Sequence, residues 1–219
     1  MKPKNFSTGN YYHIYTRGTE KRKIFIDKQD YQRFLILLHL CNNSEPVDIR
    51  ALFRKGLTFA EIMNIKKEAP LVDIGAYCLM TNHIHLLIKS KDADGIPRFM
   101  QKLCTAYTMY FNKKYKRTGR LFESTFKSNF IDSDEYLKYM FAYIHLNPIK
   151  LIDLHWKEKG VKNLEEAKKF LNNYLWSSYS SYIDNQNNSI LDKREFPRYF
   201  NTKKEFDDFI DDWLLFAKV

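Results

Sequence analysis

The stretch from Tyr77 to Lys89 constrains the fold of this chain more than any other part of the sequence. It holds two short apolar runs separated by Thr81-Asn82, a pattern that predicts two strands joined by a tight turn. Because side chains alternate between the faces of a strand, His83 and His85 share one face of the second strand. Two imidazoles roughly 7 Å apart at their roots can converge on one metal ion. Taken alone, however, the motif favours a half-buried strand with two solvated histidines.

Residues 132–148 are the second informative stretch, and they predict a helix opened by a capping box of Asp132 with Glu135. Tyr143 and Asn147 stand four residues apart on this helix and therefore point the same way. Because the chain has 15 tyrosines, Tyr143 taken alone also fits an amphipathic core tyrosine. Neither stretch establishes a function without the other.

Length and composition favour one domain with a sizeable core, because 44% of the 219 residues are hydrophobic. No apolar run approaches the length of a membrane span, and residues 1–10 lack the apolar segment of a signal peptide, so no membrane partner is expected. Three cysteines, Cys41, Cys78 and Cys104, are widely spaced and odd in number. They are interpreted as buried thiols in a reducing compartment, which predicts a cytoplasmic location.

The formal net charge of +10 indicates an acidic partner. The excess is uneven, since residues 203–218 carry three lysines against five carboxylates, a net charge of −2. Two basic clusters, residues 17–23 and 113–120, lie among aromatic residues, as in proteins that bind single-stranded nucleic acid. A basic surface that only keeps the chain soluble fits the charge equally well. The candidate DNA-contacting residues are Arg17, Lys21, Arg22, Lys23, Lys113, Lys114, Lys116, Arg117, Arg120 and Lys127.

Periodicity and capping signals predict an α+β chain with a mainly antiparallel sheet and helices packed on it. The expected elements are a strand at 11–17, a helix at 27–41, the hairpin, a helix at 95–115, a strand at 121–131, the helix at 132–148, a helix from 163, a polar loop at 184–189 and a final acidic helix capped by Thr202. Residues 43–70 predict a surface insert with two short helices, the second opened by a capping box of Thr58 with Glu61. His13 is interpreted as a packed strand histidine, although it can face the same way as the metal pair.

Five short motifs follow one another over about residues 11–182. They are Tyr12-His-Ile-Tyr-Thr-Arg-Gly18 followed by Ile24-Phe25, Tyr77 with Met80-Thr-Asn-His-Ile-His-Leu-Leu87, Tyr110-Phe-Asn112 with Gly119-Arg-Leu-Phe122, Tyr143-Ile-His-Leu-Asn-Pro148, and Trp176-Ser-Ser-Tyr179. With these motifs the chain resembles the REP-associated tyrosine transposases, which are HUH single-tyrosine transposases and nucleases. Five motifs in order are a specific signal, whereas any one of them can arise by chance.

The resemblance implies a sheet of ferredoxin-like order, the HUH nuclease fold, and a single-stranded DNA substrate that often carries a hairpin. It implies that His83 and His85 bind a divalent ion, Mg²⁺ or Mn²⁺, and that Asn147 is the third ligand. Imidazole and amide ligands by themselves also admit zinc or nickel. The implied nucleophile is Tyr143, which precedes the Asn-Pro pair. One departure is Thr125, which stands where the family often has an arginine and so weakens a phosphate or base contact.

These inferences predict a transposase that cleaves and rejoins DNA through a 5′-phosphotyrosine. Its domain is expected to span residues 1–183, with the insert at about 43–70 and residues 184–219 as an acidic helical extension. Two alternatives stay open, a non-catalytic sequence-specific DNA-binding protein on the same fold and a hydrolase that uses water instead of Tyr143. Monomer and homodimer both remain compatible with the sequence.

Overall fold

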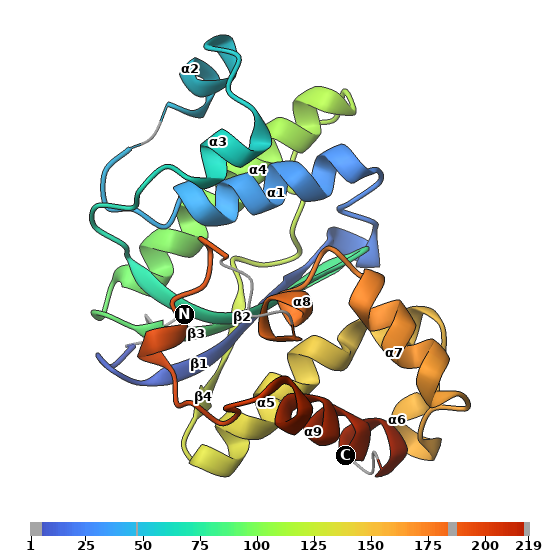
Figure 1. Ribbon diagram of the computed structural model, residues 1–219. Coiled ribbons are helices and arrows are strands. Elements are labelled where there is room, and N and C mark those ends of the chain that lie inside the picture. Colours follow the sequence, from blue (N-terminus) through green and yellow to red (C-terminus); the bar gives the residue numbers. More distant parts are fainter. Residues whose placement is uncertain (1–5, 47, 184–187, 217–219) are drawn as a thin grey trace.

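A four-stranded antiparallel sheet lies at the centre of the protein in the computed structural model, which describes residues 6–46, 48–183 and 188–216 (Figure 1). Its strands are β1 Tyr11–Arg17, β2 Val72–Met80, β3 His83–Ser90 and β4 Lys127–Ile131. They are ordered β2-β3-β1-β4, and each neighbouring pair is antiparallel. The predicted α+β class and the ferredoxin-like order are therefore confirmed.

The hairpin of β2 and β3 forms as predicted, with Met80 paired to His83 across the turn. The register shifts beside Gly75, where the ring of Phe196 lies against the strand. A Cβ atom at Gly75 would stand 2.6 Å from that ring, which is closer than real side chains approach. Glycine at this position therefore lets the C-terminal part of the chain pack directly on the sheet.

Two helices, α1 Lys28–Leu40 and α4 Gly95–Lys114, cover one face of the sheet (Figure 1). The fully buried sheet residues that pack in this layer include Ile14, Ile84, Leu86 and Ile88. α1 begins at the predicted cap, since Asp27 accepts a hydrogen bond from the backbone N–H of Asp30 at 3.1 Å. This face is an apolar core that holds the helices in place.

The opposite face carries α5 Asp134–Leu146, which packs on Ala76, Cys78 and Leu87 (Figure 1). The predicted cap of this helix was wrong by one residue. The capping residue is Ser133, whose Oγ accepts a hydrogen bond from the backbone N–H of Tyr136 at 3.2 Å. Aspartate and serine are comparably good capping residues, so a sequence with both in succession does not by itself select between them.

Helices after α5 build a second core on this side of the sheet. They are η2 Asn147–Leu151, α6 Trp156–Lys159, α7 Leu164–Asn173, α8 Tyr179–Ile183 and α9 Lys203–Phe216. The short η3 Lys193–Glu195 lies outside this core and contacts β2. The predicted acidic helix is α9, and its buried Phe206 and Ile210 share a core with Ala142 of α5. The predicted polar loop at 184–189 falls mainly on residues 184–187, which lie outside the described residues.

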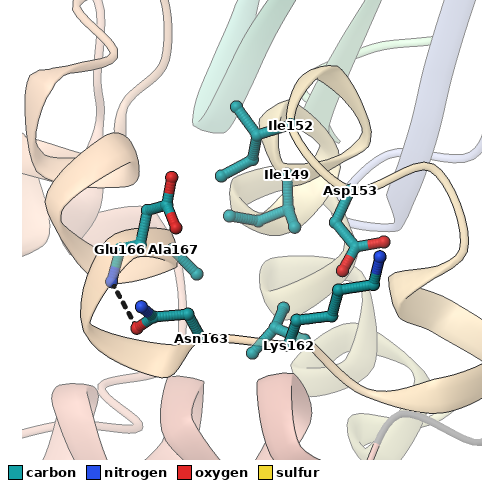
Figure 2. A pocket seen from close by; sticks show the side chains of 8 residues that line it. Ile149, Ile152, Asp153, Lys162, Asn163, Glu166 and Ala167 are labelled. Atoms are coloured by element: carbon teal, nitrogen blue, oxygen red, sulfur yellow. Dashed lines mark hydrogen bonds between the residues drawn. The ribbon is translucent and has the colours of Figure 1, made fainter.

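Figure 2 shows the beginning of α7, where Asn163 Oδ1 accepts a hydrogen bond from the backbone N–H of Glu166 at 3.1 Å. A cavity of about 100 Å³ lies beside this cap, between η2 and α7. Ile149 and Ile152 form part of its wall, and Asp153 also lines it. None of the candidate site residues lines this cavity.

The predicted insert contains α2 Ile49–Arg54 and α3 Phe59–Met63, and the capping box of Thr58 with Glu61 is present. The strand predicted at 121–131 is shorter than expected, because β4 begins only at Lys127. The segment before it contains the buried core residue Phe122, which pairs with Gly18 through a single bridge rather than a ladder. In the described part of the chain, no helix combines the length and apolar character that a membrane crossing requires.

Candidate active site

A cavity of about 280 Å³ opens where β1 ends and β3 begins, on the face of the sheet that α5 covers. Its wall combines histidine, tyrosine and basic side chains. The lining residues are Tyr15, Thr16, Arg17, Lys21, Asn82, His83, His85, Glu123, Ser124, Lys127 and Tyr143. The strand alternation thus places His83 and His85 on one face, and the fold brings Tyr143 from α5 to the same cavity.

His83 has a defined hydrogen-bonding state. Its Nδ1 lies 2.6 Å from Asn82 Oδ1, and the amide of Asn82 is oriented because its Nδ2 donates to the carbonyl of Lys21 at 3.0 Å. An amide oxygen only accepts, so Nδ1 of His83 carries the proton and Nε2 has a free lone pair. Burial lowers the pKa of His83 to about 4, with the charges of Lys150 and Arg17 acting in the same direction. His83 is therefore neutral near pH 7, as a metal ligand must be.

His85 is almost fully buried and has a histidine partner. Its Nδ1 lies 2.8 Å from Nε2 of His13, and the two rings stack with centroids 5.0 Å apart. Burial holds the pKa of His85 well below its ordinary value and lowers that of His13 to about 4. His13 is therefore packed, as predicted, but it also faces the same way as the metal pair.

Tyr143 meets this pair of imidazoles edge-on. Its ring centroid is 5.4 Å from that of His85 and 5.7 Å from that of His13. Burial raises the pKa of Tyr143. The phenol is thus protonated at neutral pH and needs a cation or base before it can attack a phosphate.

Asn147 is fully buried one turn beyond Tyr143. Its Nδ2 donates to the backbone carbonyl of Tyr143 at 2.8 Å, whereas its Oδ1 has no hydrogen-bond partner in the described part of the chain. An unpaired buried oxygen is costly and therefore calls for an explanation. Asn147 is not among the lining residues of the cavity, and no group of three or more His, Cys, Asp or Glu residues suited to a metal occurs within the described ranges. Imidazole nitrogens and amide oxygens are donors that a divalent ion accepts, and of the three residues His83 and His85 line the cavity.

Residues 7–147 match the protein family described as Transposase IS200 like, which covers well over half of the chain. The chain belongs to this family. It is therefore a tyrosine transposase, an enzyme that binds DNA and acts in DNA transposition. The match ends at Asn147, so it includes the histidine pair and Tyr143, whereas the helices from α6 onward lie beyond it.

A solved structure of a REP-associated tyrosine transposase bound to a REP hairpin is similar to this transposase. The TM-score is 0.50, the sequence identity is 11%, and the alignment covers 92% of this chain and 98% of that chain. At this identity the likeness shows a shared fold. A search among curated proteins gives no significant match.

Beyond the family match, the transposase brings a further cation to Tyr143. Lys157 Nζ lies 4.1 Å from the centroid of the Tyr143 ring. Burial and the nearby charge of Lys150 lower the pKa of Lys157 to about 8. The buried Trp156 anchors α6 and so holds Lys157 in this position. The sequence contains no signal for this contact, because Lys157 follows Tyr143 by 14 residues in a segment without a clear period.

Three of the predicted DNA-contacting residues, Arg17, Lys21 and Lys127, line the candidate active-site cavity. Glu123 lies between two of them, 2.5 Å from Arg17 Nε and 3.8 Å from Lys127 Nζ. The segment directly after the second basic cluster lies beside the first, since Thr19 N donates to the Leu121 carbonyl at 2.9 Å. Basic residues far apart in sequence thus lie at the same end of the sheet.

The remaining predicted DNA contacts differ in how strongly the fold engages them. Lys114 Nζ lies 2.8 Å from carboxylate oxygens of Asp27 and of the buried Asp30, so it ties α4 to the start of α1. Arg117 donates to Asn112 Oδ1 at 2.9 Å, and Arg22 pairs with Glu20 at 3.4 Å. The residues with exposed side chains in these clusters include Lys23, Lys113, Lys116 and Arg120.

Proposed function

We propose that this transposase cleaves and rejoins single-stranded DNA beside a hairpin, with Tyr143 as the nucleophile. The observation that carries the proposal is the cavity in which Tyr143, His83 and His85 meet Arg17 and Lys127. A tyrosine beside two neutral imidazoles and several cations has what a phosphoryl-transfer site requires, a nucleophile and positive charge around the phosphate.

The proposed step exchanges one phosphodiester for another. The Tyr143 oxygen bonds to the phosphorus and loses its proton, while the bond from phosphorus to the 3′-oxygen breaks. The leaving 3′-oxygen takes up a proton, and the 5′ side of the break remains attached as a 5′-phosphotyrosine. A later 3′-hydroxyl reverses the same step and joins two strands without a nucleotide cofactor.

The surrounding side chains prepare this reaction. Lys157 stands over the Tyr143 ring at 4.1 Å and favours the phenolate, while Arg17, Lys21 and Lys127 offset the charge of the phosphate. His83 and His85 would hold a divalent ion, Mg²⁺ or Mn²⁺, through Nε2, with Asn147 Oδ1 as third donor. Such an ion, when bound, supplies Lewis acidity to the scissile phosphate.

The proposed substrate rests on charge and on placement. The net charge of +10, and the position of the segment after the second basic cluster beside the first, support binding to a DNA backbone. The similar transposase was solved with a REP hairpin, which supports a hairpin as the element recognised. In this proposal residues 1–183 form the catalytic domain, and residues 184–219 form an extension outside the cavity.

The deciding experiment incubates the protein with end-labelled single-stranded oligonucleotides that carry a hairpin, with Mg²⁺ or Mn²⁺, and follows the covalent adduct on a denaturing gel. Wild type is expected to form an adduct that Tyr143→Phe does not form. Tyr139→Phe is the matched control, because Tyr139 lies one turn earlier on α5 and does not line the cavity. Cleavage without an adduct would assign the reaction to water, and binding without cleavage would indicate a DNA-binding protein that is not an enzyme of this type.

A further inference from the structure

The two candidate metal ligands differ in what holds their second ring nitrogen. His83 Nδ1 faces an amide oxygen of Asn82, which leaves one possible arrangement of the proton. His85 Nδ1 faces Nε2 of His13, and each of these nitrogens can donate or accept. The contact at His85 therefore has two arrangements, and they have opposite consequences for a metal.

In the first arrangement, His85 Nδ1–H donates to His13 Nε2, and His85 Nε2 keeps its lone pair. In the second, His13 Nε2–H donates to His85 Nδ1, and the proton of the neutral His85 ring moves to Nε2, where it excludes a metal. Ligating histidines in proteins commonly donate their other ring N–H to a fixed acceptor. Asn82 plays this part for His83, and His13 occupies the equivalent position for His85.

We propose that His13 is a positioning residue of the active site, which accepts the Nδ1–H of His85 and thereby keeps His85 Nε2 free and oriented for a divalent ion. This inference rests on the metal site of the proposed function. It adds a residue outside the ligand set, on a different strand, whose contribution is a hydrogen bond and not a bond to the ion.

The packing around His13 keeps its ring in this orientation. The His13 side chain is 5% exposed. Its ring stacks on those of Tyr15 and His85, with distances between ring centroids of 4.9 Å and 5.0 Å. The register of the sheet sets the contact, because β1 pairs Tyr15 with His85 and so leaves His13 at the diagonal position. The Tyr143 ring, whose centroid is 5.7 Å from that of His13 at an interplanar angle of 71°, limits rotation on the remaining side.

Two substitutions separate the hydrogen bond from the packing. His13→Phe keeps a flat ring in the same space but removes the acceptor, whereas His13→Gln restores an acceptor oxygen on a flexible chain. His39→Phe is the matched control. His39 is another buried histidine, lies on α1 against the opposite face of the sheet and contacts the Ile65 carbonyl at 2.8 Å.

Mn²⁺ affinity, measured by electron paramagnetic resonance without DNA, is the main readout. We expect His13→Phe to weaken Mn²⁺ binding about 10–100-fold, and His13→Gln to recover most of that loss. His39→Phe should bind Mn²⁺ as wild type does, and adduct formation by His13→Phe should return at saturating Mn²⁺. Nitrogen NMR of metal-free wild type should show His85 protonated at Nδ1, a measurement that does not depend on whether the variants fold.

Protonation of His85 at Nε2, or unchanged Mn²⁺ affinity in a folded His13→Phe, would overturn the inference. Tyr143→Phe should keep wild-type Mn²⁺ affinity, which separates this inference from the proposed nucleophile. A wild type whose Mn²⁺ binding depends on His13 but which forms no adduct would refute the proposed reaction and leave the inference standing. A wild type that forms the adduct but does not bind Mn²⁺ would refute the inference and leave the proposed reaction standing.

Discussion

The two faces of the central sheet differ in chemistry, although the same strands supply both. On β3, Leu86 points into the apolar layer beneath α1 and α4, whereas its neighbour His85 points toward α5. The α1 side is filled by aliphatic and aromatic side chains, while the α5 side adds to its own apolar core a cavity with histidines and Tyr143, and the amide oxygen of Asn147, which has no partner among the described residues. Apolar packing on both faces stabilises the fold, whereas the polar groups buried on the α5 side cost stability.

The largest effect is expected from a substitution on the polar face. His85→Ala removes a proposed ligand, so adduct formation should fall by about 10²–10³-fold, which is of the size found when electrostatic stabilisation of a transition state is lost. Single-turnover assays on a hairpin oligonucleotide measure this rate. Wild-type rates in His85→Ala would exclude this face as the reaction centre.

A matched change on the apolar face should affect stability instead. Leu86 is fully buried, so Leu86→Ala is expected to lower the free energy of unfolding by about 2–5 kcal/mol through lost burial and a cavity. Denaturant titration measures the loss, and the adduct rate per folded molecule should stay at the wild-type value. If Leu86→Ala slowed the reaction in fully folded protein, the two faces would not be separable in this way.

Acid should destabilise the fold through the polar face. Burial lowers the pKa of His13 and His83 to about 4 and that of His145 to about 3, so the unfolded chain binds protons first as the pH falls below about 6.5. The stabilisation present above pH 6.5 is therefore lost progressively down to about pH 4 for His13 and His83 and about pH 3 for His145. Each such histidine contributes a slope of up to about 1.4 kcal/mol per pH unit. Denaturant titrations between pH 4.5 and 7 measure this slope, and a flat profile would contradict it.

A smaller effect is expected for the cation over Tyr143. Lys157→Met should slow adduct formation about tenfold, since a cation over an aromatic face contributes roughly 1 kcal/mol or more when partly desolvated. The loss should lessen at higher pH, where more of the phenol ionises. Lys157→Arg should keep most of the rate, and the exposed Lys159 on the same helix supplies the control Lys159→Met. Equal rates of adduct formation for Lys157→Met and Lys159→Met would show that Lys157 does not assist the reaction of Tyr143.

The smallest effects are expected at the exposed basic residues. Reversing the charge at Lys113 and Lys116 should weaken DNA binding several-fold for all sequences. The slope of the logarithm of the binding constant against the logarithm of the salt concentration should become less steep by about 0.7 per lost single-strand contact. Lys114→Ala should mainly destabilise the fold, because Lys114 is held by Asp27 and Asp30. Filter binding at several salt concentrations and denaturant titration measure the two quantities. If Lys114→Ala alone removed DNA binding without loss of stability, Lys114 would be the DNA-contacting residue in place of Lys113 and Lys116.

Much of the fold follows from local patterns. Alternation along β3 separates Ile84 from His83 and His85, and turn residues and caps indicated the hairpin and the beginning of α1. The beginning of α5 was misplaced by one residue, and β4 proved shorter than the apolar pattern of residues 121–131 suggested. Such errors arise because neighbouring capping residues compete, and because buried loop residues such as Phe122 resemble strand residues in sequence.

The sequence by itself determined which residues share a face or a helix turn, because strand and helix periods act over a few residues. It thereby paired His83 with His85 and Tyr143 with Asn147, within the family that the motifs indicated. The tertiary structure alone decided that His13 bonds to His85, that Lys157 stands over Tyr143 and that Lys114 is tied to α1. These contacts depend on strand register and on how helices pack across the sheet. Both are set by the burial of the whole core, which no local pattern contains.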